Sequence, residues 1–200
     1  MAWVRARQLQ LLLTQIDRLP DSERRAICER IAAADVVQIQ KAAGLDWIPM
    51  KLGIDLAHAV TEGMGRERAR HFFRDQFAVT LNNAVLGSLV AAVTRHISAD
   101  PRPGLRWLPR GHDLLFKGVG RLVVEVTPDK PEAVLSLVDL PPDIAADRVW
   151  LDRYAWSAAS IQVLWRAPTE CEVLTSEPEN RRAQFRMWWV DPRSSRARGP

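Results

Sequence analysis

The chain has 200 residues, 47% of them hydrophobic and 26% charged, and a formal net charge of +4. This length and composition support one globular domain with a core and exclude a fibrous or disordered chain. The last ten residues carry three arginines and one aspartate, so half of the net charge lies in that tail and the remainder is too weak to indicate nucleic-acid binding.

Apolar residues at helical spacing predict helices through the first half of the chain. Leucines at 9, 12 and 13 and an isoleucine at 16 predict a helix over 4–17 that begins near the N-terminus. Pro20 ends it, and a second helix is expected to run over 21–44 up to a glycine stop. After the connector "LDWIP", a third helix is expected over 50–61, with breaks at the two glycines that follow.

The stretch "GRERARHFFRDQF" at 65–77 predicts a fourth helix that continues to about residue 97. Its phenylalanines fall on one apolar stripe, which we expect to face the core. Its arginines alternate with acidic residues on the other side, which we expect to face solvent. His71 stands four residues before Asp75, a spacing that favours a surface pair on the helix.

The pattern changes at 98–111, where three prolines and two glycines predict a loop and make a helix improbable. Beyond this loop the apolar residues alternate with period two, as in half-buried strands. The predicted order is two strands, a helix and two strands, at 120–127, 132–140, 147–167, 170–176 and 182–190.

Helices and strands are therefore segregated along the chain, which predicts an α+β fold. We expect an N-terminal helical part packed on a four-stranded antiparallel sheet, with one helix crossing it. The expected organisation is N-terminal helices at 1–46, an α+β domain at 47–190 that forms one compact unit with them, and a disordered basic tail at 191–200.

Several classes of protein are not indicated. No apolar run reaches the roughly 18 residues that span a bilayer, and the N-terminus lacks the features of a signal peptide. Cys28 and Cys171 are far apart and form no CxxC motif, so no zinc or iron–sulfur site is expected. We therefore expect a cytoplasmic protein without membrane association.

Catalytic motifs are equally sparse. The four histidines, at 58, 71, 96 and 112, show no metal-binding spacing, and the chain has neither a GxSxG motif nor a phosphate-binding loop. His96 stands near a predicted helix end, where its charge would complement the helix dipole. His112 lies in a predicted loop beside Asp113 and stays of interest for that reason. We predict no enzyme activity and no metal site.

Arginine, lysine and aromatic residues interleave in the loop after residue 100. Four basic residues form a candidate patch there: Arg102, Arg106, Arg110 and Lys117. A structural loop with extended arginine stems explains them better than a nucleic-acid interface does, so nucleic-acid binding is kept as an alternative only.

A series of segments gives the chain a family resemblance over residues 47–189. The segments, in chain order, are "WIP", "GRERARHFFRDQF", "VLGSLV", "PRPGLRWLPRG", "FKGVGRLVVEV", "AVLSLVDLP" and "AQFRMWW". Together they resemble a large paralogous family of bacterial, specifically myxobacterial, proteins of about this length. That family is in turn similar to the haem–nitric-oxide-binding and vinyl-reductase-like (V4R) sensor domains.

The resemblance implies a ligand pocket between the helices and the sheet. It also implies a haem ligand on the helix before the proline loop, where His96 is the one candidate. That histidine stands closer to Pro101 than the haem-binding branch would place it, and the Tyr-x-Ser-x-Arg clamp for haem propionates is missing, since the sole tyrosine, Tyr154, is followed by Ala155 and Trp156. From the sequence alone, therefore, no cofactor is expected and haem is disfavoured.

The sequence favours a non-catalytic regulatory or scaffold domain that binds a protein partner and takes a small apolar ligand into the helix–sheet pocket. Homo-oligomers are compatible with this interpretation. The candidate pocket or interface aromatics are Trp107, Phe116, Trp150, Trp156 and Trp165. Haem-based gas sensing and nucleic-acid binding through 101–117 and the tail are the alternatives.

Overall fold

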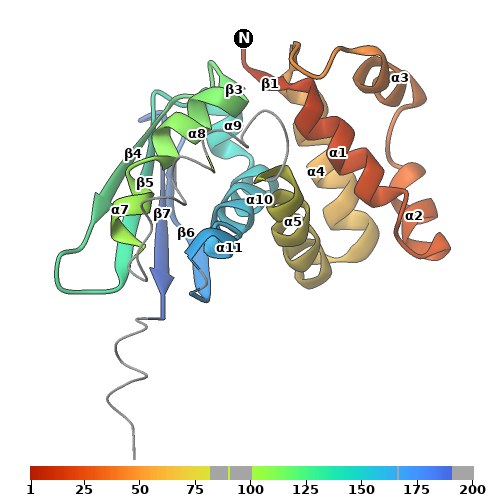
Figure 1. Ribbon diagram of the computed structural model, residues 1–200. Coiled ribbons are helices and arrows are strands. Elements are labelled where there is room, and N and C mark those ends of the chain that lie inside the picture. The colour runs from red at the N-terminus through yellow and green to blue at the C-terminus, as the bar shows by residue number, and fades with distance from the viewer. Residues whose placement is uncertain (82–89, 91–100, 166, 191–200) are drawn as a thin grey trace, which may run out of the picture.

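The computed structural model describes residues 1–81, 90, 101–165 and 167–190. Figure 1 shows the N-terminal helices on one side of the molecule, a sheet on the other side, and the helix α10 between them. The N-terminal helices are α1 (Ala6–Ile16), α2 (Asp21–Cys28), α3 (Ala33–Lys41), α4 (Met50–Met64) and α5 (Arg66–Leu81). The later ones are α7 (Arg102–Leu105), α8 (Leu108–Leu115), α9 (Pro142–Ala146), α10 (Arg148–Ala159) and α11 (Gln162–Trp165).

Two features of the N-terminal helices differ from the prediction. The expected helix over 21–44 is two helices, because the chain turns after Cys28 and Ala32 takes an extended conformation with φ −63° and ψ 131°. The expected break at Gly63 does not occur, since α4 continues to Met64. Gly63 instead allows α2 to approach, because a Cβ at this position would lie 2.7 Å from the Cγ1 atom of Ile27. Gly65, with φ 78°, ends the helix.

A small sheet that the sequence did not indicate joins three distant segments. Its order is β2-β1-β3, with antiparallel pairing of β1 (Trp3–Arg5) to both β2 (Trp47–Pro49) and β3 (Phe116–Lys117). The predicted helix at 4–17 therefore begins only at Ala6, and the connector "WIP" is a strand. Strands of two or three residues are too short to show an alternating pattern, so tertiary pairing alone defines them.

The proline-rich stretch contains two short helices where a loop was expected. Pro103 and Pro109 stand in the first turns of α7 and α8. Proline is tolerated there because the first amides of a helix have no partner within it. The prediction of a loop over this part of 98–111 is therefore wrong. It rested on the number of prolines, whereas their position in the first turn of each helix is compatible with helix formation.

The main sheet agrees with the prediction. It contains β4 (Arg121–Val126), β5 (Glu132–Val138), β6 (Thr169–Glu177) and β7 (Arg182–Trp189) in the antiparallel order β4-β5-β7-β6. Alternate residues of β7 are buried, which accounts for the period-two pattern of its sequence. The α+β fold, with a helical part, a four-stranded sheet and a crossing helix, is confirmed.

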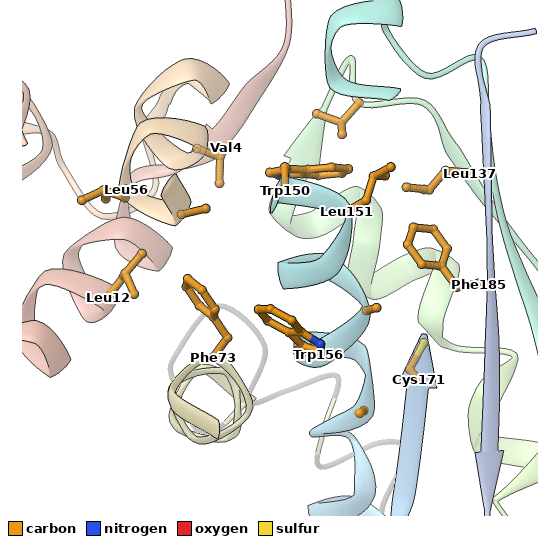
Figure 2. Packing of buried hydrophobic residues seen from close by; sticks show 14 of the residues in the cluster. Val4, Leu12, Leu56, Phe73, Leu137, Trp150, Leu151, Trp156, Cys171 and Phe185 are labelled. Atoms are coloured by element: carbon orange, nitrogen blue, oxygen red, sulfur yellow. The ribbon is translucent and has the colours of Figure 1, made fainter. Parts of the chain in front are cut away.

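Helix α10 joins the two halves of the core. Asp147 caps its N-terminus by accepting a hydrogen bond of 2.8 Å from the amide of Trp150. Figure 2 shows Trp156 on the side of this helix that faces Phe73 of α5, and Leu151 on the side that faces Leu137 and Phe185 of the sheet. The rings of Phe73 and Trp156 stack at 6.2 Å between centroids. One continuous core therefore extends from the N-terminal helices to the sheet.

The charged face of α5 is not wholly solvated, contrary to expectation. Arg70 and Arg74 both form ion pairs with Glu170 of β6, and the Arg74 pair measures 2.8 Å. His71 is exposed and lies 3.4 Å from Glu67, so its partner is the acid one turn before it and not Asp75. The arginine face of α5 therefore contacts the edge strand of the sheet.

Candidate ligand pocket

A pocket lies between α8, α10, α5 and the inner face of the sheet, and Gln8 of α1 also reaches its wall. The cavity that its side chains enclose measures about 100 Å³. This volume is below the roughly 300–1,000 Å³ of typical small-molecule sites, so a larger ligand requires the walls to move apart. Apolar residues dominate the lining, among them Phe77, Leu81, Leu115, Leu122, Leu135, Ile161 and Leu164.

Aromatic rings form one wall of this pocket. Phe116 lies 6.4 Å from Trp150 and 6.1 Å from Tyr154, and Trp150 lies 5.4 Å from Tyr154, all between ring centroids. These rings come from α10 and from the start of β3, so the helix and the small sheet build the wall together. Burial raises the pKa of the Tyr154 hydroxyl, which therefore stays protonated and can donate or accept a hydrogen bond.

His112 is a buried imidazole in the same wall. Leu108, His112 and Leu115 line the pocket from one face of α8, at the spacing i, i+4, i+7. The Nδ1 atom of His112 lies 3.0 Å from the Tyr154 hydroxyl. Its Nε2 atom is buried without a hydrogen-bond partner of good geometry among residues 1–81, 90, 101–165 and 167–190.

Burial lowers the pKa of His112, although the backbone of Gly120 and the charge of Asp113 act in the opposite direction. The imidazole is therefore neutral at pH 7. When Nδ1 carries the proton and donates it to the Tyr154 oxygen, the lone pair of Nε2 is free. A neutral histidine held in this way is competent to bind a metal atom.

Arg153 is a charged residue of the pocket wall. Only 4% of its surface is exposed. Its Nη1 atom donates a hydrogen bond of 3.1 Å to the carbonyl of Gly53 in α4, and its guanidinium lies 5.5 Å from the centre of the Phe73 ring. Burial lowers the pKa of Arg153 to about 10, so the side chain still carries its charge at neutral pH.

The five aromatic residues proposed from the sequence are divided by the structure. Trp107, Phe116 and Trp150 line the pocket. Trp156 and Trp165 are buried elsewhere, the first against Phe73 and the second with its Nε1 atom donating a hydrogen bond of 3.0 Å to the hydroxyl of Thr169. The geometry thus brings three of the five together, and the functional role of all five stays a prediction.

The four basic candidates lie on the outside of the same region. Arg106, Arg110 and Lys117 are exposed, and Arg102 is half-buried. The Arg110 guanidinium lies 5.2 Å from the centre of the Trp107 ring, a cation–π distance. The tail residues 191–200 and His96 lie outside the described part of the chain.

Two further observations concern the described residues only. None of the helices formed by 1–81, 90, 101–165 and 167–190 combines the length and apolarity of a bilayer span. Within the same ranges, histidine, cysteine, aspartate and glutamate do not gather in threes in a way that could hold a metal ion.

Arg153, Tyr154 and Gln8 are polar pocket residues that sequence reasoning did not select. The sequence contained a signal for two of them, because Arg153 and Gln8 each interrupt an apolar helical stripe. Arg153 follows Trp150 by three residues, and Gln8 stands four residues after Val4 and four before Leu12. A polar residue at an apolar position of a helix deserves consideration as a site residue.

Comparisons with known proteins show where this architecture recurs. No protein-family model matches the sequence, and a search of curated proteins gives no match. Among solved structures, a point mutant of the Fe(II) unliganded H-NOX protein from K. algicida has a TM-score of 0.61 at 8% identity, over 94% of this chain and 97% of that one. An oxygen-binding H-NOX domain related to soluble guanylate cyclases has a TM-score of 0.56 at 10% identity, over 92% and 94%.

A third structure, from work on haem distortion in the H-NOX family, has a TM-score of 0.53 at 11% identity, over 92% of this chain and 95% of that one. The chain therefore has the H-NOX fold over nearly its whole length. The resemblance to haem–nitric-oxide-binding domains is confirmed at the level of fold, whereas the myxobacterial relationship stays a prediction.

These likenesses contradict the expectation that haem is disfavoured. That expectation rested on missing sequence motifs, yet an Fe(II) H-NOX protein, an oxygen-binding H-NOX domain and an H-NOX structure from work on haem distortion share the fold at 8–11% identity. At such identity a motif defined at fixed positions has little weight. The correction is that haem must be judged on the groups that line the pocket.

Proposed function

We propose that this chain is a haem-binding sensor domain, with the haem held in the pocket between α8, α10 and the sheet. The observation that carries the proposal is His112, a buried neutral imidazole whose Nε2 atom lacks a well-placed partner in the pocket wall. It occurs in a chain with the fold of haem-binding H-NOX proteins.

The residues present fit a haem group. Haem is a flat apolar ring with acidic side chains, and its iron is commonly held by a histidine. The pocket offers apolar walls, one neutral imidazole oriented by Tyr154, and one buried cation, Arg153, to meet an acidic side chain. When bound, haem supplies an iron atom that takes up small gases.

The protein's own residues set the conditions around that group. Tyr154 orients the ring of His112 through the hydrogen bond at Nδ1, and Nε2 can bind a metal in the tautomer in which Nδ1 is the donor. The leucines of α8 and of the sheet exclude water from the wall. Such a dry environment strengthens electrostatic contacts made inside the pocket.

The proposal extends to the role of the chain as a whole. We propose a non-catalytic, cytoplasmic regulatory domain that passes ligand binding on to a protein partner, which can be a second copy of the chain. Its support is the sensor-like fold, in which a ligand bound near α10 contacts the same helix that packs against the N-terminal helices.

The test is a titration of the purified, ligand-free protein with haemin, followed by the absorption spectrum in the Soret region. The wild-type chain is compared with His112→Leu, which keeps an apolar side chain of similar size, and with His96→Ala. The exposed residue His71 provides a matched control as His71→Ala. Wild type, His96→Ala and His71→Ala are expected to give a saturable band at a 1:1 ratio, and His112→Leu a weaker and shifted one.

Each other outcome is decisive. The absence of a saturable Soret band in the wild type would reject the haem proposal. A band that His96→Ala abolishes and His112→Leu retains would assign the iron ligand to His96 and remove His112 from the account. A band that all variants keep unchanged would indicate surface adsorption of haemin and also reject the proposal.

A further inference from the structure

Arg153 differs from the other arginines that pack against α10 and the sheet. Asp152, its neighbour, pairs with Arg66 at 2.8 Å and with Arg148 at 3.2 Å. Glu170 pairs with two further arginines of α5. These carboxylates are already paired with other arginines. Within the described ranges no acid pairs with Arg153, although only 4% of its surface is exposed.

A buried charge without an opposite charge is strongly unfavourable unless something compensates it. The groups that contact the Arg153 guanidinium are the Gly53 carbonyl and the face of the Phe73 ring. Both are neutral, and burial alone accounts for the lowered pKa of Arg153. The side chain therefore keeps its charge in a place where the described part of the protein offers it no anion.

The place is the wall of the pocket. Trp150, Arg153, Tyr154 and Ser157 line it from successive turns of α10, at the spacing i, i+3, i+4, i+7. Gln8 of α1 also lines it, and the Oε1 atom of Gln8 is buried without a hydrogen-bond partner in residues 1–81, 90, 101–165 and 167–190. The charged side chain of Arg153 and the side chain of Gln8 thus line a largely apolar space.

We propose that the pocket selects an apolar molecule that carries a carboxylate, and that Arg153 is the residue that binds this carboxylate. The inference rests on the proposed function only in assuming that the pocket holds a ligand. The carboxylate can belong to a haem propionate or to a fatty acid, because either joins an apolar body to an acidic end. A guanidinium can bind either one through two parallel hydrogen bonds.

The experiment compares acids with partners of the same shape that lack the charge. Haemin is compared with its dimethyl ester, and dodecanoate with dodecanol, in calorimetric titrations of the full chain. We expect the wild type to bind at least one acid about 10- to 100-fold more tightly than its uncharged counterpart, as for a charge-assisted hydrogen bond. This comparison requires no variant.

The variant Arg153→Met keeps the apolar stem and removes the charge. We expect it to bind the acid and its uncharged counterpart with equal affinity, and to unfold on heating at no lower temperature than the wild type in the absence of ligand, because an uncompensated charge is gone. Arg153→Lys retains the charge and is expected to keep part of the acid preference. Arg148→Met, on the same helix but half-exposed and paired with Asp152, should behave as the wild type.

The two pairs of titrations distinguish a haem propionate from a fatty acid as the source of the carboxylate. They also distinguish the role of Arg153 from the proposal that haem is the ligand. Acid preference with haemin assigns the carboxylate to a propionate. Acid preference with dodecanoate and no haemin binding supports the role of Arg153 and rejects haem as the ligand. Equal affinity for acid and counterpart in both arms, binding of neither pair, or a preference that survives in Arg153→Met overturns the inference.

Discussion

At the scale of single residues, the contact between Phe73 and Trp156 connects the two halves of the molecule. Phe73 is fully buried and its ring stacks on Trp156 with an angle of 22° between the ring planes. The neighbouring residue Phe72 is only partly buried. Adjacent residues of the same type on α5 therefore differ sharply in burial, which makes them a matched pair.

We expect Phe73→Ala to lower the free energy of unfolding by about 3–5 kcal/mol, because it removes a fully buried ring and leaves a cavity beside Trp156. Phe72→Ala should cost distinctly less. Urea denaturation monitored by circular dichroism measures both. Equal losses for the two variants would show that the stack between α5 and α10 does not dominate the packing of α5.

Single residues also show how much of the candidate site could be predicted from the sequence. The apolar stripe of α10 was recognisable, and with it Trp150 as a pocket candidate. Arg153 could have been noticed as a polar residue at an apolar helical position, and His112 was noticed as a residue of a predicted loop, but the partners of neither could be predicted. Tyr154 is 42 residues from His112 and Gly53 is 100 residues from Arg153. Contacts between residues so far apart produce no periodic pattern in the sequence.

At the scale of elements, the ion pairs of α5 hold this helix on the edge of the sheet. Arg74 is largely buried and also donates hydrogen bonds to the side chain of Gln162 and to the carbonyl of Thr169. Burial of the Glu170 carboxyl acts to raise its pKa, but hydrogen bonds from Arg74 and Arg70 and their charges outweigh it, so the pKa is lowered. The ionised form is therefore the one that stabilises the folded state.

We expect Glu170→Gln to lower the free energy of unfolding at pH 7 by about 1–2 kcal/mol, a value reduced by the partial exposure of the pair. Because the folded-state pKa lies below the ordinary value of 4.5, the contribution is complete above that value. It disappears as the pH falls through the folded-state pKa.

Urea denaturation of wild type and Glu170→Gln between pH 7 and pH 3 measures this difference. The gap between the two should be constant above about pH 5.5 and shrink towards pH 3. Glu172→Gln, an exposed substitution on the same strand, is the control and should show no such gap. A gap that stays the same at all pH values would contradict an ionic contribution from Glu170.

At the scale of the whole molecule, the sheet and the helical half were predictable and the way they are joined was not. Strands β4 to β7 are each long enough to show alternation, and their turns carry clear signals. The small sheet of β1, β2 and β3 joins three short segments far apart in the chain, and helices α7 and α8 begin with prolines that composition alone assigns to a loop.

The pocket belongs to this scale as well, because its walls come from both halves. Residues of α1 and α5 face it from the helical half, and residues of α8, α10 and the sheet complete it. Only the packed fold brings them together. A variant that fills the pocket without disturbing its surroundings therefore tests the account as a whole.

Ala158 lines the pocket and Ala146 of α9 is exposed on the surface, so Ala158→Trp and Ala146→Trp form a matched pair. The decisive measurement is the dissociation constant of haemin for both, from the Soret absorbance, beside the wild type. We predict that Ala158→Trp weakens binding at least about tenfold, a change of roughly 1.4 kcal/mol, while Ala146→Trp binds as the wild type does. Equal dissociation constants for all three proteins would show that haemin does not occupy this pocket and would contradict the account.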